Sequence, residues 1–120
     1  MTGRVHPGET CSSFVMQGVI DFLLSEASEA QFLREKFIFK IVPMLNPDGV
    51  IHGNSRCSLE GCDLNRKWRA PSKELHPTIF YTKKMIRTLH EKYGVDFFCD
   101  FHGHSKKYFC DGNQSFYPFQ

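Results

Sequence analysis

Several features are scarce or missing in this sequence of 120 residues, and each excludes a class of protein. The five cysteines are odd in number and contain no Cys-x-x-Cys pair, which argues against a disulfide framework and a zinc knuckle. No apolar run approaches the roughly 18 residues of a membrane span, and we expect no signal peptide. Fifteen basic and 13 acidic residues give a net charge of only +2 without a basic tract, which does not favour nucleic-acid binding.

These absences predict a soluble, cytoplasmic protein with reduced thiols, which contacts neither a membrane nor nucleic acid. The cysteines are Cys11, Cys57, Cys62, Cys99 and Cys110. Cys57 and Cys62 are close enough in sequence to pair or to bind a metal, but no second cluster completes such a site, so we interpret them as structural. The chain can bury about 65% of its unfolded surface, enough for one modest core. We therefore expect one domain or part of one.

Two short stretches, Arg4–Glu9 and Cys99–His104, hold the residues with metal-binding chemistry. Each places a histidine just after a predicted strand, and the first adds a carboxylate three residues later. Catalytic zinc usually takes three protein ligands and leaves one position for water or substrate. His6, Glu9 and His102 would supply two nitrogens and one oxygen for one zinc ion. A lone histidine at a strand end is more often a hydrogen-bonded or surface residue, and that alternative stays open on these residues alone.

The order of the expected elements predicts an α/β fold with a mostly parallel, or mixed, sheet and flanking helices. The expected strands are the end of one before His6, then residues 37–42 and 95–101, and the expected helices are residues 13–24, 28–36 and 77–92. Ser12 or Ser13 would cap the first helix and Gly94 would end the last. The apolar residues expected to form the buried face of the first helix are Phe14, Val15, Gly18, Val19, Phe22 and Leu23.

Residues 44–68 form a long segment without clear periodicity, which we expect to be a functional loop. Its first part, Asn46–Gly49, has the chemistry of a turn. In parallel sheets, ligands bind beyond the carboxyl ends of the strands. This loop, His6 and His102 all fall at that edge, so we expect them to meet.

The loop also supplies groups that suit a carboxylate ligand. Arg56 and Arg66 add positive charge, and an arginine fork binds a carboxylate bidentately, while the Asn65 amide can donate to the same group. Zinc beside a carboxylate anchor predicts hydrolysis next to a free C-terminus. The alternative for each arginine is a solvated loop charge. Asp100 shares a strand face with His102, and it either orients a neighbouring ligand or is a buried, satisfied carboxylate.

Five blocks of sequence resemble the zinc metallocarboxypeptidases, in particular their cytosolic carboxypeptidase branch. They occur in the order in which that family has them and extend to about residue 105. The blocks are Arg4-Val5-His6-Pro7-Gly8-Glu9-Thr10, Phe39-Lys40-Ile41-Val42-Pro43-Met44-Leu45-Asn46-Pro47-Asp48-Gly49-Val50, Arg56-Cys57-Ser58-Leu59, Asp63-Leu64-Asn65-Arg66 and Cys99-Asp100-Phe101-His102-Gly103-His104-Ser105.

The resemblance implies roles for these residues. His6, Glu9 and His102 would be the zinc ligands, Asn65 and Arg66 would hold the terminal carboxylate of the substrate, and Arg56 would polarise the scissile carbonyl. Members of this branch shorten glutamate chains, so it also implies action on C-terminal glutamates of acidic or polyglutamylated protein tails such as tubulin. Location in the cytosol, with association with microtubules, is a further expectation.

The resemblance covers only part of the family's catalytic domain. Its general-base glutamate, its substrate-capping tyrosine and its amino-terminal β-domain have no match here, and residues 106–120 stay unassigned. We therefore expect residues 1–120 to be the amino-terminal half of such a domain. Two alternatives stay open: an inactive remnant that binds zinc or acidic tails without turnover, and a zinc amidohydrolase of the aspartoacylase kind, which shares the His-x-x-Glu turn and an Asn-Arg element.

Overall fold

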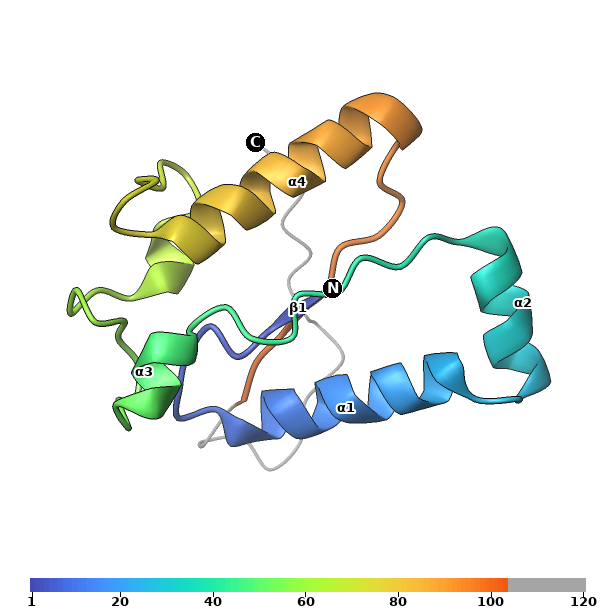
Figure 1. Ribbon diagram of the computed structural model, residues 1–120, viewed down its shortest axis with the longest axis horizontal. Helices are drawn as coiled ribbons and strands as arrows, with labels where there is room; N and C mark the ends of the chain where they lie inside the picture. The colour runs from blue at the N-terminus through green and yellow to red at the C-terminus, as the bar shows by residue number, and fades with distance from the viewer. Residues whose placement is uncertain (104–120) are drawn as a thin grey trace.

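A small parallel sheet lies at the centre of the computed structural model, which describes residues 1–103 (Figure 1). Strand β1 (Thr2–Gly3) pairs with β2 (Asp100–Phe101), with Thr2 opposite Asp100 and Gly3 opposite Phe101. Val42 forms a parallel bridge to Thr2. Because the Thr2 amide donates to the Cys99 carbonyl and the Gly3 amide to the Val42 carbonyl, β1 lies between the other two segments.

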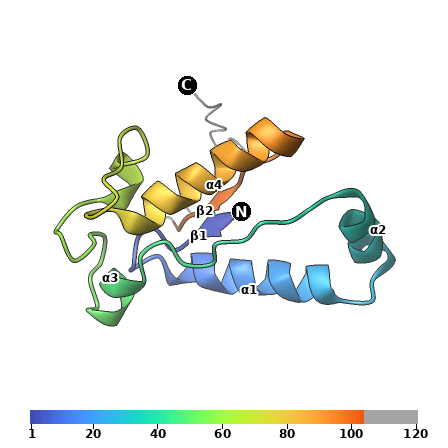
Figure 2. The same cartoon turned by 45° about the horizontal axis from the view of Figure 1, so that its top comes forward.

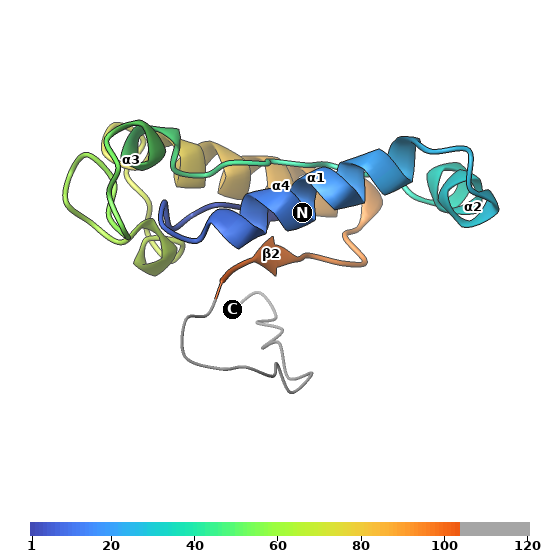
Figure 3. The same ribbon diagram turned by 90° about the horizontal axis from the view of Figure 1, so that it is seen from below.

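Helices flank this sheet, as the sequence predicts. The helical elements are α1 (Thr10–Leu24), α2 (Ser28–Lys36), α3 (Pro47–Ile51), the 3-10 helix η1 (Leu64–Arg66) and α4 (Pro77–Tyr93). Helices α1 and α4 run along opposite sides of the strands, with α2 and α3 at opposite ends of the molecule (Figure 1). The four labelled α-helices lie to one side of β2, as the view from below shows (Figure 3). The predicted α/β class with parallel strands is confirmed.

The expected strands at residues 37–42 and 95–101 are much shorter than predicted. Among the described residues the first is reduced to the single bridge at Val42, and the second to Asp100–Phe101. Strand pairing needs a partner backbone, and residues 1–3 supply it through contacts such as Met1 N to Lys40 O at 2.7 Å. The β-favouring composition of these runs is not enough to extend them.

Helix α1 differs from its prediction at its start and in its buried face. It begins at Thr10 with Glu9 at the N-cap, and neither Ser12 nor Ser13 caps it; the Ser12 hydroxyl donates to the Glu9 carbonyl instead, at 2.9 Å. Its buried residues are Ser12, Met16 and Leu23, whereas Phe14 is 73% exposed. The Met16 side chain of the helix packs against Gly3 of β1, since a Cβ at Gly3 would lie 3.4 Å from it.

Helix α2 spans the predicted residues, and α4 ends as predicted at Gly94, whose φ of 78° suits glycine. Residues 44–68, however, are not structureless. The predicted turn at Asn46–Gly49 is the start of α3, because the buried Asn46 side chain caps that helix, accepting from the Gly49 amide at 3.0 Å. The same side chain donates to the Val5 carbonyl at 3.2 Å and ties α3 to the segment before His6.

One cluster of buried apolar residues in the described part of the chain contains Val5, Leu45, Leu64 and Ile79. Burying one such side chain stabilises a fold by about 1.5–3 kcal/mol. Val5 directly precedes His6, and Leu64 lies between Asp63 and Asn65. The core therefore holds the first predicted ligand and the Asp63–Arg66 segment close together, beside the start of α4 (Figure 2).

Candidate metal centre

A tight turn positions His6 and Glu9. The Glu9 amide donates to the His6 carbonyl at 3.1 Å, and the Gly8 amide donates to the Ser55 carbonyl at 2.8 Å. Arg4, just before the turn, has a φ of 53°, a left-handed conformation that is uncommon for residues other than glycine. It is held there because its amide donates to Ser12 Oγ at 3.1 Å and its Nε to the Pro7 carbonyl at 2.7 Å. Backbone strain of this kind tends to occur at functional sites.

The Glu9 carboxylate lies between two imidazoles that come from opposite ends of the described chain. His6 Nδ1 is 2.8 Å from Oε1, and His102 Nδ1 is 3.0 Å from Oε2, which also accepts from the Gly103 amide at 2.9 Å. The two imidazole centroids are 5.2 Å apart. One donor atom from each of His6, Glu9 and His102 lies within 4.8 Å of the others, which is close enough to share a metal ion.

The other nitrogen of each imidazole faces a second carboxylate. His6 Nε2 is 2.9 Å from Asp63 Oδ1, and His102 Nε2 is 2.9 Å from Asp100 Oδ2. A proton held on Nε2 by a carboxylate leaves the Nδ1 lone pair for a metal, which is the usual arrangement around a ligating histidine. Two Nδ1 atoms and one carboxylate are also a typical donor set for catalytic zinc. The residues present therefore fit a zinc ion.

Burial and hydrogen bonding shift the pKa values of Glu9, Asp63 and His102. Burial disfavours ionised Glu9, but the Gly103 amide and the two imidazoles outweigh it and hold the pKa of Glu9 below its ordinary value. Burial opposes ionisation of Asp63 as well, and its contacts with His6, the Asn65 amide and Arg56 lower its pKa. The hydrogen bond to Asp100 raises the pKa of His102 against the opposing effect of burial.

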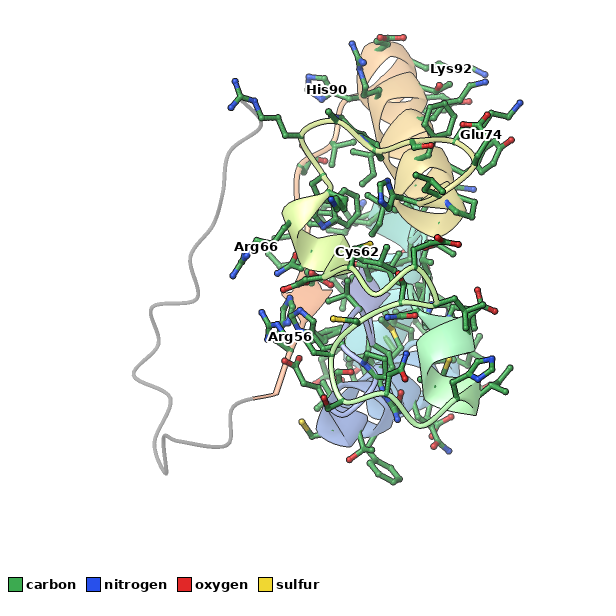
Figure 4. All side chains as sticks on the ribbon, turned by 90° about the vertical axis from the view of Figure 1, so that its left-hand side faces the viewer. Arg56, Cys62, Arg66, Glu74, His90 and Lys92 are labelled. Carbon is green, nitrogen blue, oxygen red and sulfur yellow. The ribbon has the colours of Figure 1, made fainter. Side chains whose placement is uncertain are left out.

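Arg56 and Arg66 project from the same side of the molecule (Figure 4). Arg56 is attached to the cluster through Asp63, whose Oδ2 lies 2.9 Å from its Nε and 2.8 Å from one Nη. Arg66 is exposed at the end of η1. The backbone amide of Asn65 donates to Asp63 Oδ1 at 2.9 Å. Of the three residues predicted to face the substrate, Arg56 and Asn65 therefore contact Asp63, and Arg66 ends the short helix that Asp63 caps.

The sequence-based prediction assigned no role to Asp63. The aspartate begins the Asp63-Leu64-Asn65-Arg66 block, and its carboxylate caps η1 while bonding His6 and Arg56. No local pattern pointed to this role, because the partner His6 lies 57 residues away in sequence. The four described cysteines are free thiols, and Cys62 packs against the core with its Sγ 3.3 Å from Ser58 Oγ, in line with a structural role.

Comparison with known proteins supports the interpretation of this cluster. The profile of the zinc carboxypeptidase family matches residues 1–116. The chain belongs to the zinc carboxypeptidase family. This membership supports the carboxypeptidase interpretation over the aspartoacylase-type alternative, and it implies zinc as the metal.

Individual relatives confirm the predicted resemblance to the cytosolic carboxypeptidases. Cytosolic carboxypeptidase 3 of Bos taurus is 56% identical over 118 residues, which cover 94% of this chain and 12% of the relative. Cytosolic carboxypeptidase 1 of Homo sapiens is 56% identical over 108 residues, which cover 89% and 9%. The chain therefore spans about one tenth of the length of these curated relatives.

Solved carboxypeptidases share the fold. A metallo-carboxypeptidase from Pseudomonas aeruginosa, solved in complex with (2-guanidinoethylmercapto)succinic acid, superposes with a TM-score of 0.76 at 38% identity. One from Burkholderia cenocepacia gives 0.77 at 34% identity. Each match covers 86% of this chain and 27% of the solved chain. In the described residues no helix is both long and apolar enough to cross a membrane.

Replacing Asp63 with asparagine is expected to weaken zinc binding by about 10–100-fold. The donors that face Asp63 are His6 Nε2–H, the Asn65 amide and the Arg56 guanidinium. Asparagine offers one acceptor oxygen and one NH2, so at least one of these donors faces another donor. The measurement is a competitive titration with a chelator. Asp21→Asn, an exposed change on α1, is the control, and equal affinities of the two variants would contradict the prediction.

The metal-free chain should show a stability maximum in mildly acidic solution. The pKa of His102 is raised, so its contribution is complete below about pH 6.5, the unfolded value, and is lost as pH rises through the folded value. The pKa values of Glu9 and Asp63 are lowered, so their contributions are complete above about pH 4–4.5 and are lost as pH falls through the folded values.

His102→Gln isolates the alkaline limb of this profile, because glutamine keeps polar contacts but does not ionise. Thermal unfolding with chelator should show a larger advantage of the wild-type chain over this variant near pH 5.5 than near pH 8.5. The same advantage at both values would mean that protonated His102 does not stabilise the cluster.

Proposed function

We propose that this chain carries the zinc-binding part of a carboxypeptidase active site that removes C-terminal amino acids, glutamate above all, from acidic protein tails such as polyglutamylated tubulin. The observation that carries the proposal is the convergence of His6 Nδ1, the Glu9 carboxylate and His102 Nδ1, with each Nε2 held by a carboxylate. Membership of the zinc carboxypeptidase family supports it.

In the proposed mechanism, His6, Glu9 and His102 hold the metal, which when bound polarises a carbonyl and lowers the pKa of water towards neutrality. Asp63 and Asp100 keep the Nε2 protons in place, so both imidazoles present Nδ1. The carboxylates Glu9, Asp63 and Asp100 are each within 3.0 Å of an imidazole nitrogen, so we assign none of them as general base.

Arg56 is proposed to stabilise negative charge on the oxygen of the scissile carbonyl. Its contacts with Asp63 use Nε and one Nη of a guanidinium that has five N–H donors. The Asp63 carboxylate thus aims the side chain, and other N–H groups remain for the substrate. Asn65 and Arg66 are proposed to hold the terminal carboxylate, through the bidentate geometry that arginine provides.

The distribution of charge supports an acidic substrate. Although the whole chain has a net charge of +2, residues 66–92 contain eight lysines and arginines and only two carboxylates. The cations are Arg66, Lys67, Arg69, Lys73, Lys83, Lys84, Arg87 and Lys92, and the carboxylates are Glu74 and Glu91. A segment of this sign attracts an acidic tail over distances of about a Debye length, roughly 8–10 Å in ordinary salt.

The test combines metal analysis of the purified chain with release of glutamate from a peptide that ends in polyglutamate. One zinc per chain together with glutamate release would support the whole proposal. An otherwise identical peptide with an amidated C-terminus is the matched control, because it removes the carboxylate that Asn65 and Arg66 are proposed to hold.

Other outcomes separate the proposed zinc ligands from the proposed hydrolysis. One zinc per chain without release would support the ligand set and the alternative of a chain that binds without turnover. A chain that takes up no zinc would contradict the proposed ligands.

A further inference from the structure

Thr2 is a buried polar residue next to the metal centre to which neither the sequence motifs nor the family blocks assign a role. It lies in β1, directly opposite Asp100 of β2, and only 2% of its surface is exposed. Its hydroxyl donates to Asp100 Oδ1 at 2.7 Å. The backbone fixes this pair as well, because the Thr2 amide donates to the Cys99 carbonyl at 2.8 Å.

The two oxygens of Asp100 have separate partners. Oδ1 accepts from Thr2, and Oδ2 lies 2.9 Å from His102 Nε2. A carboxylate can rotate about its Cβ–Cγ bond, and this torsion has only broad preferences of its own. A donor fixed on one oxygen therefore determines where the other oxygen points, and here it points at the imidazole.

On the His6 side of the centre, a carboxylate that is held by other donors also faces Nε2 of the imidazole. There, Asp63 is held by the Arg56 guanidinium and the Asn65 amide, and its Oδ1 faces His6 Nε2. The His102 side chain is 28% exposed, against 4% for His6, so packing restrains His102 less. The orientation of His102 consequently depends more on Asp100.

We propose that Thr2 is a positioning residue of the metal centre: its hydroxyl orients the Asp100 carboxylate, which holds the Nε2 proton of His102 and leaves Nδ1 for the ion. This inference rests on the zinc ligands of the proposed function. It extends the centre to a buried hydroxyl that touches neither the metal nor a ligand. The chain Thr2–Asp100–His102 is thus the counterpart of Arg56–Asp63–His6.

Thr2→Val tests this inference, because valine keeps the branched shape of threonine and its preference for strands but has no hydroxyl. We expect Thr2→Val to weaken Zn²⁺ binding about tenfold, the lower end of the effect of groups that orient metal ligands. Thr2→Ser restores the hydroxyl and should bind within about threefold of wild type. The readouts are a chelator competition with Zn²⁺ and the visible spectrum of the Co²⁺-loaded chain, which reports ligand geometry.

Two controls separate positioning from general damage to the fold. Thr82→Val removes the hydroxyl of another buried threonine, in the middle of α4, and should leave metal affinity unchanged. In an Asp100→Asn background, Thr2→Val should have little further effect, because both changes act on the same hydrogen-bond chain.

Each alternative result overturns the inference. Unchanged affinity in Thr2→Val, an equal loss in Thr2→Ser, or additive effects with Asp100→Asn would all mean that the hydroxyl does not act through Asp100. If wild-type protein takes up no Zn²⁺, the ligand assignment fails together with this inference. If wild-type protein binds Zn²⁺ and the Thr2 variants bind it equally well, the ligand assignment stands and only the role of Thr2 is lost.

Discussion

Alanine at position 102 is expected to abolish zinc binding while leaving the chain folded. Changes that only disturb the orientation of a ligand cost about 10–100-fold in metal affinity, so loss of one of three ligands should cost more than about 100-fold. His102 follows β2 and its side chain is 28% exposed, so its removal leaves no large cavity in the core. His6, with only 4% of its side chain exposed, would give a less clear test because its removal also disturbs packing.

Elemental analysis after extensive dialysis gives the measurement, and His90→Ala gives the control. His90 is an exposed histidine in the last turn of α4, and it lies far from Arg56 (Figure 4). We expect one zinc per chain for wild type and for His90→Ala, and none for His102→Ala. A full complement of zinc in His102→Ala would remove this residue from the ligand set.

The convergence of His6 and His102 could be predicted from sequence because it follows from the topology of the sheet. Parallel strands bring their carboxyl ends to one edge of a sheet, so residues just after β1 and β2 must lie near each other. His6 and His102 follow this rule across 96 positions of sequence. The local pattern placed Asp100 on the same strand face as His102 but left its role open, and its carboxylate does contact His102.

Other parts of the molecule depend on contacts that a local pattern does not contain. The role of Asp63 required knowledge that η1 packs beside the His6 turn, and no periodicity links the two segments. Strand length depends on the partner backbone, and among the described residues the β-favouring run at residues 37–42 forms a strand bridge at Val42 alone. The apolar residues Phe14 and Phe22 of α1 suggested a buried face, but the described residues leave them 73% and 44% exposed.

Asn46–Gly49 shows how tertiary contacts override turn chemistry. The sequence Asn-Pro-Asp-Gly is typical of a turn, and a proline at the first position also suits the start of a helix. The buried Asn46 side chain resolves the choice: it caps α3 through the Gly49 amide and donates to the Val5 carbonyl. The cap and the proline are local signals for a helix, and the contact with Val5 fixes this helix against the segment before His6.

Gly49→Ala is expected to destabilise the protein by about 1–3 kcal/mol, the usual cost of forcing an extra methyl group into a packed site. A Cβ at this position would lie 2.5 Å from Pro7 Cγ, 2.7 Å from Asn46 Oδ1 and 2.8 Å from the Cys57 carbonyl oxygen. Each of these atoms belongs to a ring, a cap or the backbone, so none can move aside easily. Helix propensity alone predicts the opposite sign, because alanine is favoured over glycine by about 1 kcal/mol inside a helix.

Gly18→Ala is the matched control for this prediction. Gly18 lies within α1, and apart from the backbone of this helix a Cβ there would meet no atom of residues 1–103 within 4 Å. Propensity should therefore dominate and stabilise the protein by about 0.5–1 kcal/mol. Chemical denaturation of both variants measures the two free energies of unfolding. Because Pro7 follows His6 directly, Gly49→Ala should also weaken zinc binding, whereas Gly18→Ala should not. Stabilisation by both substitutions would mean that α3 does not pack against the His6 turn as closely as the structure places it.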